Sequence, residues 1–238
     1  MFSALDVRLT KLYKGFIEVH DGSTSWKVYD ENWDKVRRNM LCKHLGFEVN
    51  GNNELISLDI PSGEKIAKGD VMCYSTRSNE TSCCTHLQSY TTTSSTSIPN
   101  VNCQICDKPI ITGQNTFPKP TFSGNGTSDY TLARMDKRGW CSGNGDEYLE
   151  IDLQKEYNIF QIVVAADENQ AKWSGSYSLK YSRNTSYENS IKITGNKNGY
   201  QAASTFVDIR NVRYIKIEST DKQEFCLRIE LCEPSRYF

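Results

Sequence analysis

Residues 140–157 read WCSGNGDEYLEIDLQKEY, a cysteine in a glycine-rich loop followed by a segment that alternates apolar and acidic residues. Leu149, Ile151 and Leu153 would share one face of a strand, whereas Glu150 and Asp152 would share the other. This alternation predicts a strand with one buried face and one solvated face.

The same period of two recurs through the rest of the second half of the chain. The further runs are IFQIVVA (159–165), SYSLKYS (176–182), TFVDI (205–209), RYIKIES (213–219) and CLRIELC (226–232). With these runs separated by loops and no helical pattern among them, we expect an antiparallel sandwich or barrel. Such folds present their loops at the ends, where binding sites usually lie.

The first half has a different pattern. In the segment 7–30, two alternating stretches flank Asp21-Gly22, which predicts a β-hairpin. Its facing apolar residues would be Ile17 and Val19 opposite Trp26 or Val28.

One helix is expected after the hairpin. Asp34 is a suitable N-cap and Gly46 a suitable C-terminal glycine. Cys42 falls within the apolar set at helical spacing, so its sulfur is expected in the core; the other members of that set are Val36, Met40, Leu41 and Leu45.

A polar segment separates the two halves. Residues 91–116 are rich in serine and threonine, and their two prolines predict an interruption of regular structure. We place the boundary near Cys103 to Cys106, which gives one domain over residues 1–104 and a second over residues 105–238.

Composition and glycosylation motifs favour an extracellular protein. The 28 basic and 29 acidic residues give a formal charge of −1, so no global attraction to nucleic acid or an anionic membrane is expected. Nine cysteines beside three histidines, without paired CxxC motifs at zinc spacing, favour disulfides in an oxidising compartment. Three N-glycosylation acceptors agree with that compartment: Asn79, Asn125 and Asn184.

The N-terminal residues have no apolar core of a signal peptide, and no apolar run is long enough to span a bilayer. We therefore expect a mature fragment of a larger secreted or membrane-anchored protein. Neither a nucleophile elbow, an HExxH motif nor a phosphate-binding glycine loop is present, so no enzymatic activity is expected.

The first half resembles the scavenger receptor cysteine-rich family. The resemblance rests on GFIEVHDGSTSWKVYDENWDKVRRNMLCKHLGF (15–47), GDVMC (69–73), SCC (82–84) and NVNC (100–103). It implies an α+β domain, a curved sheet with one helix, and the disulfides Cys42–Cys103 and Cys73–Cys83. Tyr29 stands where the family has a cysteine, and the partner of that cysteine is missing as well.

Some members of that family bind calcium through acidic pairs. The resemblance assigns such a site to Asp30, Glu31 and Asp70, since hard oxygen ligands from separate loops suit calcium. Arg77 and Ser78 replace further acidic residues of the family. The alternative is that Asp30 and Glu31 form a solvated turn.

The second half resembles the discoidin domain, also called the coagulation factor 5/8 C-type domain. The matching motifs are LARMDKRGWC (132–141), DEYLEIDLQKEY (146–157), SYSLKYSRN (176–184), RYIKIES (213–219) and CLRIELC (226–232). The resemblance implies an all-β jelly-roll barrel. It also implies the disulfides Cys106–Cys232 and Cys141–Cys226, which leave Cys84 unpaired.

Discoidin domains bind ligands through loops at one end of the barrel. The resemblance assigns this role to residues 121–130, with Phe122 and Asn125, and to residues 167–176, with Gln170, Lys172 and Trp173. The alternative for Trp173 is that it covers the barrel mouth. These residues supply only part of what insertion into a membrane needs, so any membrane contact through the loops would be weak.

We therefore expect an extracellular adhesion or recognition module that binds a protein or glycan. One alternative is the ectodomain of a signalling receptor with a collagen-type or other protein ligand; another is a structural component of a surface or matrix. Three roles are open for Cys84: a buried thiol, a rival of Cys83 for Cys73, or an intermolecular disulfide.

Overall fold

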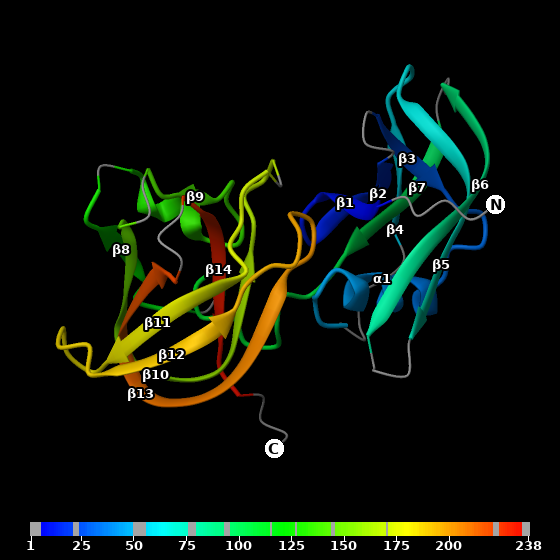
Figure 1. Ribbon diagram of the computed structural model, residues 1–238. Coiled ribbons are helices and arrows are strands. Elements are labelled where there is room, and N and C mark those ends of the chain that lie inside the picture. Colours follow the sequence, from blue (N-terminus) through cyan, green and yellow to red (C-terminus); the bar gives the residue numbers. More distant parts are fainter. Residues whose placement is uncertain are drawn as a thin grey trace. The chain divides into compact units, whose positions relative to one another are not determined.

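The computed structural model describes residues 6–20, 24–49, 56–75, 80–92, 96–114, 116–126, 128–143, 146–169, 171–220 and 224–234. The chain divides into two compact units, Met1–Gln104 and Ile105–Phe238, each built on its own sheet (Figure 1). No helix in the described ranges combines the length and hydropathy of a membrane span.

The first unit combines a mixed sheet with one helix. Its strands are β1 (Asp6–Lys11), β2 (Lys14–His20), β3 (Ser25–Tyr29), β4 (Ile56–Ile60), β5 (Lys65–Ser75), β6 (Thr81–Thr92) and β7 (Thr96–Asn102). They follow the order β4-β7-β2-β3-β5-β6, and β1 pairs with β2. The β3–β5 pair is parallel and the other pairs of this sheet are antiparallel.

The predicted hairpin is confirmed in the described strands. β2 pairs with β3 in antiparallel register, with Val19 opposite Trp26. Ile17, Val19 and Val28 are fully buried. The turn residues Asp21-Gly22 lie outside the described residues.

The predicted helix is α1 (Lys35–His44). The Asp34 side chain accepts a hydrogen bond from the backbone N–H of Arg37 at 2.8 Å, and Gly46 has a φ of +83°. Cys42 is buried with Leu41, as expected. Val36, however, is 64% exposed, because it projects from a different side of the helix than Leu41 and Cys42.

The polar segment before the boundary contains more regular structure than its composition predicts. β6 extends to Thr92, and Thr96–Asn102 forms β7, which pairs with β2 and β4 although it contains Pro99. The expectation that a proline interrupts regular structure is wrong for Pro99, whereas Pro109 lies outside the named strands. Ile98 and Val101 are both fully buried, so the strand is stabilised by two core side chains.

The second unit is almost entirely strand. Its elements are β8 (Thr121–Gly124), the 3₁₀ helix η1 (Tyr130–Ala133), β9 (Trp140–Cys141), β10 (Tyr148–Ala165), β11 (Ser176–Ser182), β12 (Asn189–Thr194), β13 (Ala203–Ser219) and β14 (Cys226–Cys232). They follow the order β12-β11-β13-β10-β14-β9, and β8 pairs with β10. In the part of the chain that the structure describes, this path does not close, so the expected barrel is an open sheet instead.

Two long strands each contain two of the predicted runs. β10 joins residues 147–153 and 159–165, and β13 joins residues 205–209 and 213–219. Both strands bend where their register shifts, next to Gln154 (φ +66°) and Asn211 (φ +53°). The bends let the first part of β10 pair with β8 and the last part with β14.

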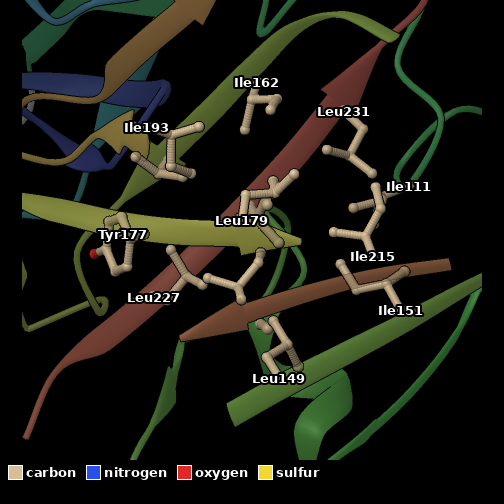
Figure 2. Packing of buried hydrophobic residues seen from close by; sticks show 14 of the residues in the cluster. Ile111, Leu149, Ile151, Ile162, Tyr177, Leu179, Ile193, Ile215, Leu227 and Leu231 are labelled. Carbon is tan, nitrogen blue, oxygen red and sulfur yellow. The ribbon is translucent and has the colours of Figure 1, made fainter. Parts of the chain in front are cut away.

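The core of the second unit lies on the apolar face predicted from residues 147–153. Leu149, Ile151 and Leu153 are fully buried. Figure 2 shows two of them among apolar side chains from the other strands; those labelled include Tyr177, Leu179, Ile193, Ile215, Leu227 and Leu231. The sequence pattern predicts no strand at β12. Ile193 is the only fully buried side chain of this strand.

Four disulfides join the pairs implied by the two resemblances. They are Cys42–Cys103 and Cys73–Cys83 in the first unit, and Cys106–Cys232 and Cys141–Cys226 in the second. Cys84 is a free, half-buried thiol. Of the two candidate partners of Cys73, the structure pairs it with Cys83 and leaves Cys84 unpaired.

Candidate ligand-binding loops of the second unit

The loop between β10 and β11, residues 166–175, is here called the Trp173 loop. Asp167 closes it on itself, because its Oδ1 accepts hydrogen bonds from the backbone N–H groups of Ala171 (3.0 Å) and Lys172 (3.4 Å). Asp167 is only 9% exposed. A carboxylate that accepts two backbone hydrogen bonds gives a short loop a defined shape.

Arg228 of β14 anchors the start of the loop. Its buried guanidinium donates Nε to the carbonyl of Ala166 and Nη2 to the carbonyl of Asp167, the latter at 3.0 Å. Gly139 (φ +103°) lies against the same point, and a Cβ there would stand 2.8 Å from the Cα of Asp167. The close approach therefore requires a glycine.

The end of the loop contains an exposed aromatic side chain, and the residue before it forms an ion pair. Trp173 is 39% exposed, whereas the next residue, Ser174, is buried. Lys172 Nζ lies 2.7 Å from Glu224 Oε2, and both side chains are more than half exposed. The Glu224 carboxylate raises the pKa of Lys172, so the lysine is charged at neutral pH.

Asn125 belongs to a neighbouring loop, and its side chain joins that loop to residues 146–148 by two hydrogen bonds, here called the loop clamp. Its Nδ2 donates to the carbonyl of Asp146 (3.2 Å), and its Oδ1 accepts from the backbone N–H of Tyr148 (2.9 Å). Phe122 is half-buried and packs against the core from β8, and its role in ligand binding stays a prediction. Gln170 lies outside the described residues.

A chain of contacts connects these loops. Glu224, the partner of Lys172, precedes Phe225, which exchanges hydrogen bonds with Ser142 at 2.9 and 3.0 Å. The Cys141–Cys226 disulfide joins the same two segments, and Glu147 accepts from the backbone N–H of Gly143 at 2.8 Å. The loops around residues 125, 143, 173 and 224 therefore form one end of the unit.

Residues 114–231 match the family model of the F5/8 type C domain. These residues of the second unit form an F5/8 type C domain. The match includes all the loops described above. No curated protein matches the chain.

Solved structures resemble this domain at low identity. A family 89 glycoside hydrolase from Clostridium perfringens is 19% identical, with a TM-score of 0.39, over 55% of this chain and 15% of its own. The F5/8 type C domain of a Bacteroides fragilis protein is 14% identical (TM-score 0.38; 49% of this chain, 92% of its own). A Clostridium perfringens CBM32 module in complex with GalNAc-β-1,3-galactose is 12% identical (TM-score 0.39; 48% and 94%).

The family model does not include the first unit, so its likeness to the scavenger receptor family stays a prediction. The acidic residues assigned to calcium there are satisfied by other groups. Asp30 is 4% exposed, and its carboxylate accepts from Arg37 Nη1 (3.1 Å) and from the backbone N–H groups of Asn32 (2.8 Å) and Val71 (2.9 Å).

The other two carboxylates of this cluster are paired as well. Asp70 accepts from Arg37 Nη1 (3.1 Å) and Asn32 Nδ2 (2.9 Å), and these hydrogen bonds lower its pKa. Glu31 forms an ion pair with Lys68 at 2.6 Å. Two protein cations thus occupy the acidic cluster, and the described residues include no group of histidine, cysteine or carboxylate side chains suited to a metal ion. The calcium expectation does not fit this arrangement.

The acceptor asparagines differ in their surroundings. Asn79 lies outside the described residues. Asn125 and Asn184 are both exposed, but the amide nitrogen of Asn125 is used by the loop clamp. In Asn184 the side-chain oxygen accepts from the backbone N–H of Ser186 at 2.9 Å.

Proposed function

We propose that the chain is an extracellular adhesion or recognition module whose F5/8 type C domain binds a protein or glycan through the Trp173 loop. The observation that supports this proposal is the 39% exposed indole of Trp173 on a loop braced by Asp167 and Arg228. An aromatic side chain held in place before the ligand arrives loses little conformational entropy on binding.

The surroundings of Trp173 suit such a ligand. The indole offers a flat apolar face, and the ion pair that the preceding residue, Lys172, forms with Glu224 offers hydrogen-bond donors and acceptors. A sugar ring, or a peptide with mixed polar and apolar side chains, needs this combination.

Four disulfides support the extracellular setting of the proposal. Disulfides persist in secreted proteins and on cell surfaces, and are rare in reducing compartments. The formal charge of −1 supports a partner recognised by a local surface rather than through long-range attraction.

The test is an array of glycans, collagens and anionic lipid vesicles, probed with the multimerised chain with and without calcium. Trp173→Ala should abolish the signal on one ligand class while the melting temperature stays unchanged. Phe206→Ala is the matched control, because Phe206 is 65% exposed on β13 of the same domain, outside the loop end. A signal that survives Trp173→Ala, or falls equally with Phe206→Ala, would refute the assignment.

A further inference from the structure

A surface pocket of about 270 Å³ lies between the end of β11, the start of β12 and the bend of β13. Asn184 and Ser186, two residues of an N-glycosylation motif, belong to its wall. Tyr181, three residues before Asn184, lines it too, together with Arg183 and Arg210. The pocket is therefore built around a potential site of covalent sugar attachment.

We propose that this pocket seats the first N-acetylglucosamine of a glycan carried by Asn184. The orientation of the Asn184 amide agrees with this role. Its oxygen is held by the backbone N–H of Ser186, while its nitrogen, the atom that carries the sugar, makes no hydrogen bond to the described residues. Asn125 is the contrasting case, since its nitrogen donates to the carbonyl of Asp146.

The lining of the pocket matches the chemistry of the sugar. The half-buried ring of Tyr181 packs against the core of the domain and gives the pocket an aromatic surface for the apolar C–H face of a pyranose. Arg183 is positioned by a hydrogen bond from its Nε to the carbonyl of Asn211 (3.3 Å). Its remaining N–H groups can donate to the acetamido oxygen or to ring hydroxyls.

Arg210 borders the same pocket from β13. Its guanidinium is oriented by two hydrogen bonds to Asp208, at 2.8 and 3.1 Å. The sugar would thus contact β11, the β11–β12 connection and the bend of β13 at once. Contacts with all three segments would stabilise the domain, because they are formed only when it is folded.

The experiment compares three forms of the chain secreted from cells that make oligomannose glycans, with the other two acceptors removed by Asn79→Gln and Thr127→Ala. The first form carries the whole glycan. The second is trimmed by endoglycosidase H to a single N-acetylglucosamine. The third carries Ser186→Ala, which removes the attachment signal but keeps the backbone N–H bonded to Asn184.

The trimmed form should melt at the same temperature as the fully glycosylated form, and about 3 °C above Ser186→Ala. Tyr181→Leu should remove the difference between the trimmed form and the Ser186→Ala form, both measured in that variant. This comparison holds even though Tyr181→Leu itself lowers stability, because it uses a difference within the variant.

Two results would overturn the proposal. One is the absence of a glycan on Asn184 in the secreted chain by peptide mass spectrometry. The other is an equal melting temperature for the trimmed form and Ser186→Ala. Neither result affects the proposed role of Trp173, which the binding array tests with separate variants.

Discussion

Arg37 lies between Asp30 and Asp70, two of the three carboxylates that the family resemblance assigns to calcium. Its Nη1 is 3.1 Å from both Asp30 and Asp70, and the Asp30 side chain is fully buried. A guanidinium in this place supplies the positive charge that a buried carboxylate needs. The family resemblance drew attention to these acids, but the sequence could not show that an arginine one helical turn beyond the N-cap would neutralise Asp30 and Asp70.

Arg37→Met should therefore destabilise the first unit by about 3 kcal/mol, because the buried Asp30 carboxylate loses its cationic partner. In thermal melts, calcium should raise the melting temperature of the variant, since no cation then neutralises Asp30 and Asp70, and leave the wild type unchanged. Lys68→Met is the control: Lys68 pairs with the exposed Glu31, so little change in stability is expected. A wild type stabilised by calcium would contradict this account.

Glu230 is a fully buried acid on β14, and no sequence pattern predicts it inside the core. Its carboxylate accepts from the backbone N–H groups of Ile111 (2.6 Å), Thr112 (2.9 Å) and Leu231 (3.0 Å), and from the Thr112 hydroxyl (2.6 Å). Burial raises the pKa of Glu230 from 4.5 to about 7, against the opposing effect of these hydrogen bonds.

A raised pKa in the folded state means that the folded domain holds the proton more tightly than the unfolded chain. This contribution to stability is fully present below pH 4.5 and is lost as the pH rises to about 7. We expect the loss of this contribution to lower the unfolding free energy by roughly 3 kcal/mol between pH 4.5 and about 7. Urea unfolding at several pH values should show a weaker pH dependence in Glu230→Gln; identical profiles would exclude this role.

The bends of β10 and β13 are the features of element scale that the periodic pattern missed. The alternation of apolar and polar residues identified the buried faces of both strands, because successive side chains of a strand point to opposite faces of the sheet. This alternation could not show that two runs belong to one strand. That depends on Gln154 and Asn211, which adopt positive φ angles, and on the Asp152–Arg213 pair (2.8 Å) beside the first bend.

Residue identity predicted the positions of the loops better than their internal structure. Trp173 was identified from its polar surroundings, and the structure places it at the surface. Arg228 and Asp167, which fix the loop, carried no signal of their own, because one lies within a strand motif and the other is an ordinary polar loop residue. Their roles depend on contacts between segments about 60 residues apart along the chain.

Asp167→Ala should loosen the Trp173 loop without unfolding the domain. Ala171 and Lys172 would lose the acceptor of their N–H groups, at a cost of about 1 kcal/mol. Hydrogen exchange followed by mass spectrometry should show faster exchange of residues 171–172 in the variant. Lys172→Met, which removes only an exposed ion pair, should leave this exchange nearly unchanged. Unaltered protection in Asp167→Ala would show that the loop is held by other contacts.

At the scale of the whole molecule, the disulfides belong to one unit or the other. Cys42–Cys103 and Cys73–Cys83 lie within Met1–Gln104, and the other two pairs lie within Ile105–Phe238. Each unit also has its own sheet and its own buried side chains. We therefore expect residues 105–238 to fold when expressed alone under oxidising conditions.

The isolated segment should show one cooperative thermal transition and contain no free thiol, since its four cysteines are all paired. Removing the link that closes β14 onto β9, by Cys141→Ser with Cys226→Ser, should cost about 2–4 kcal/mol. A segment that stays unfolded, or reacts with a thiol reagent in its native state, would show that it depends on the first unit.

The Cys106–Cys232 bond, which spans 126 residues of sequence, also determines how the chain responds to mechanical tension. A pulling force applied to the backbone just before Cys106 and just after Cys232 would pass through the two sulfur atoms and bypass the strands between them. The sheet would stay unloaded, and the domain would transmit force as a short inextensible link. Only reduction of this bond would transfer the load to the hydrogen bonds of the sheet.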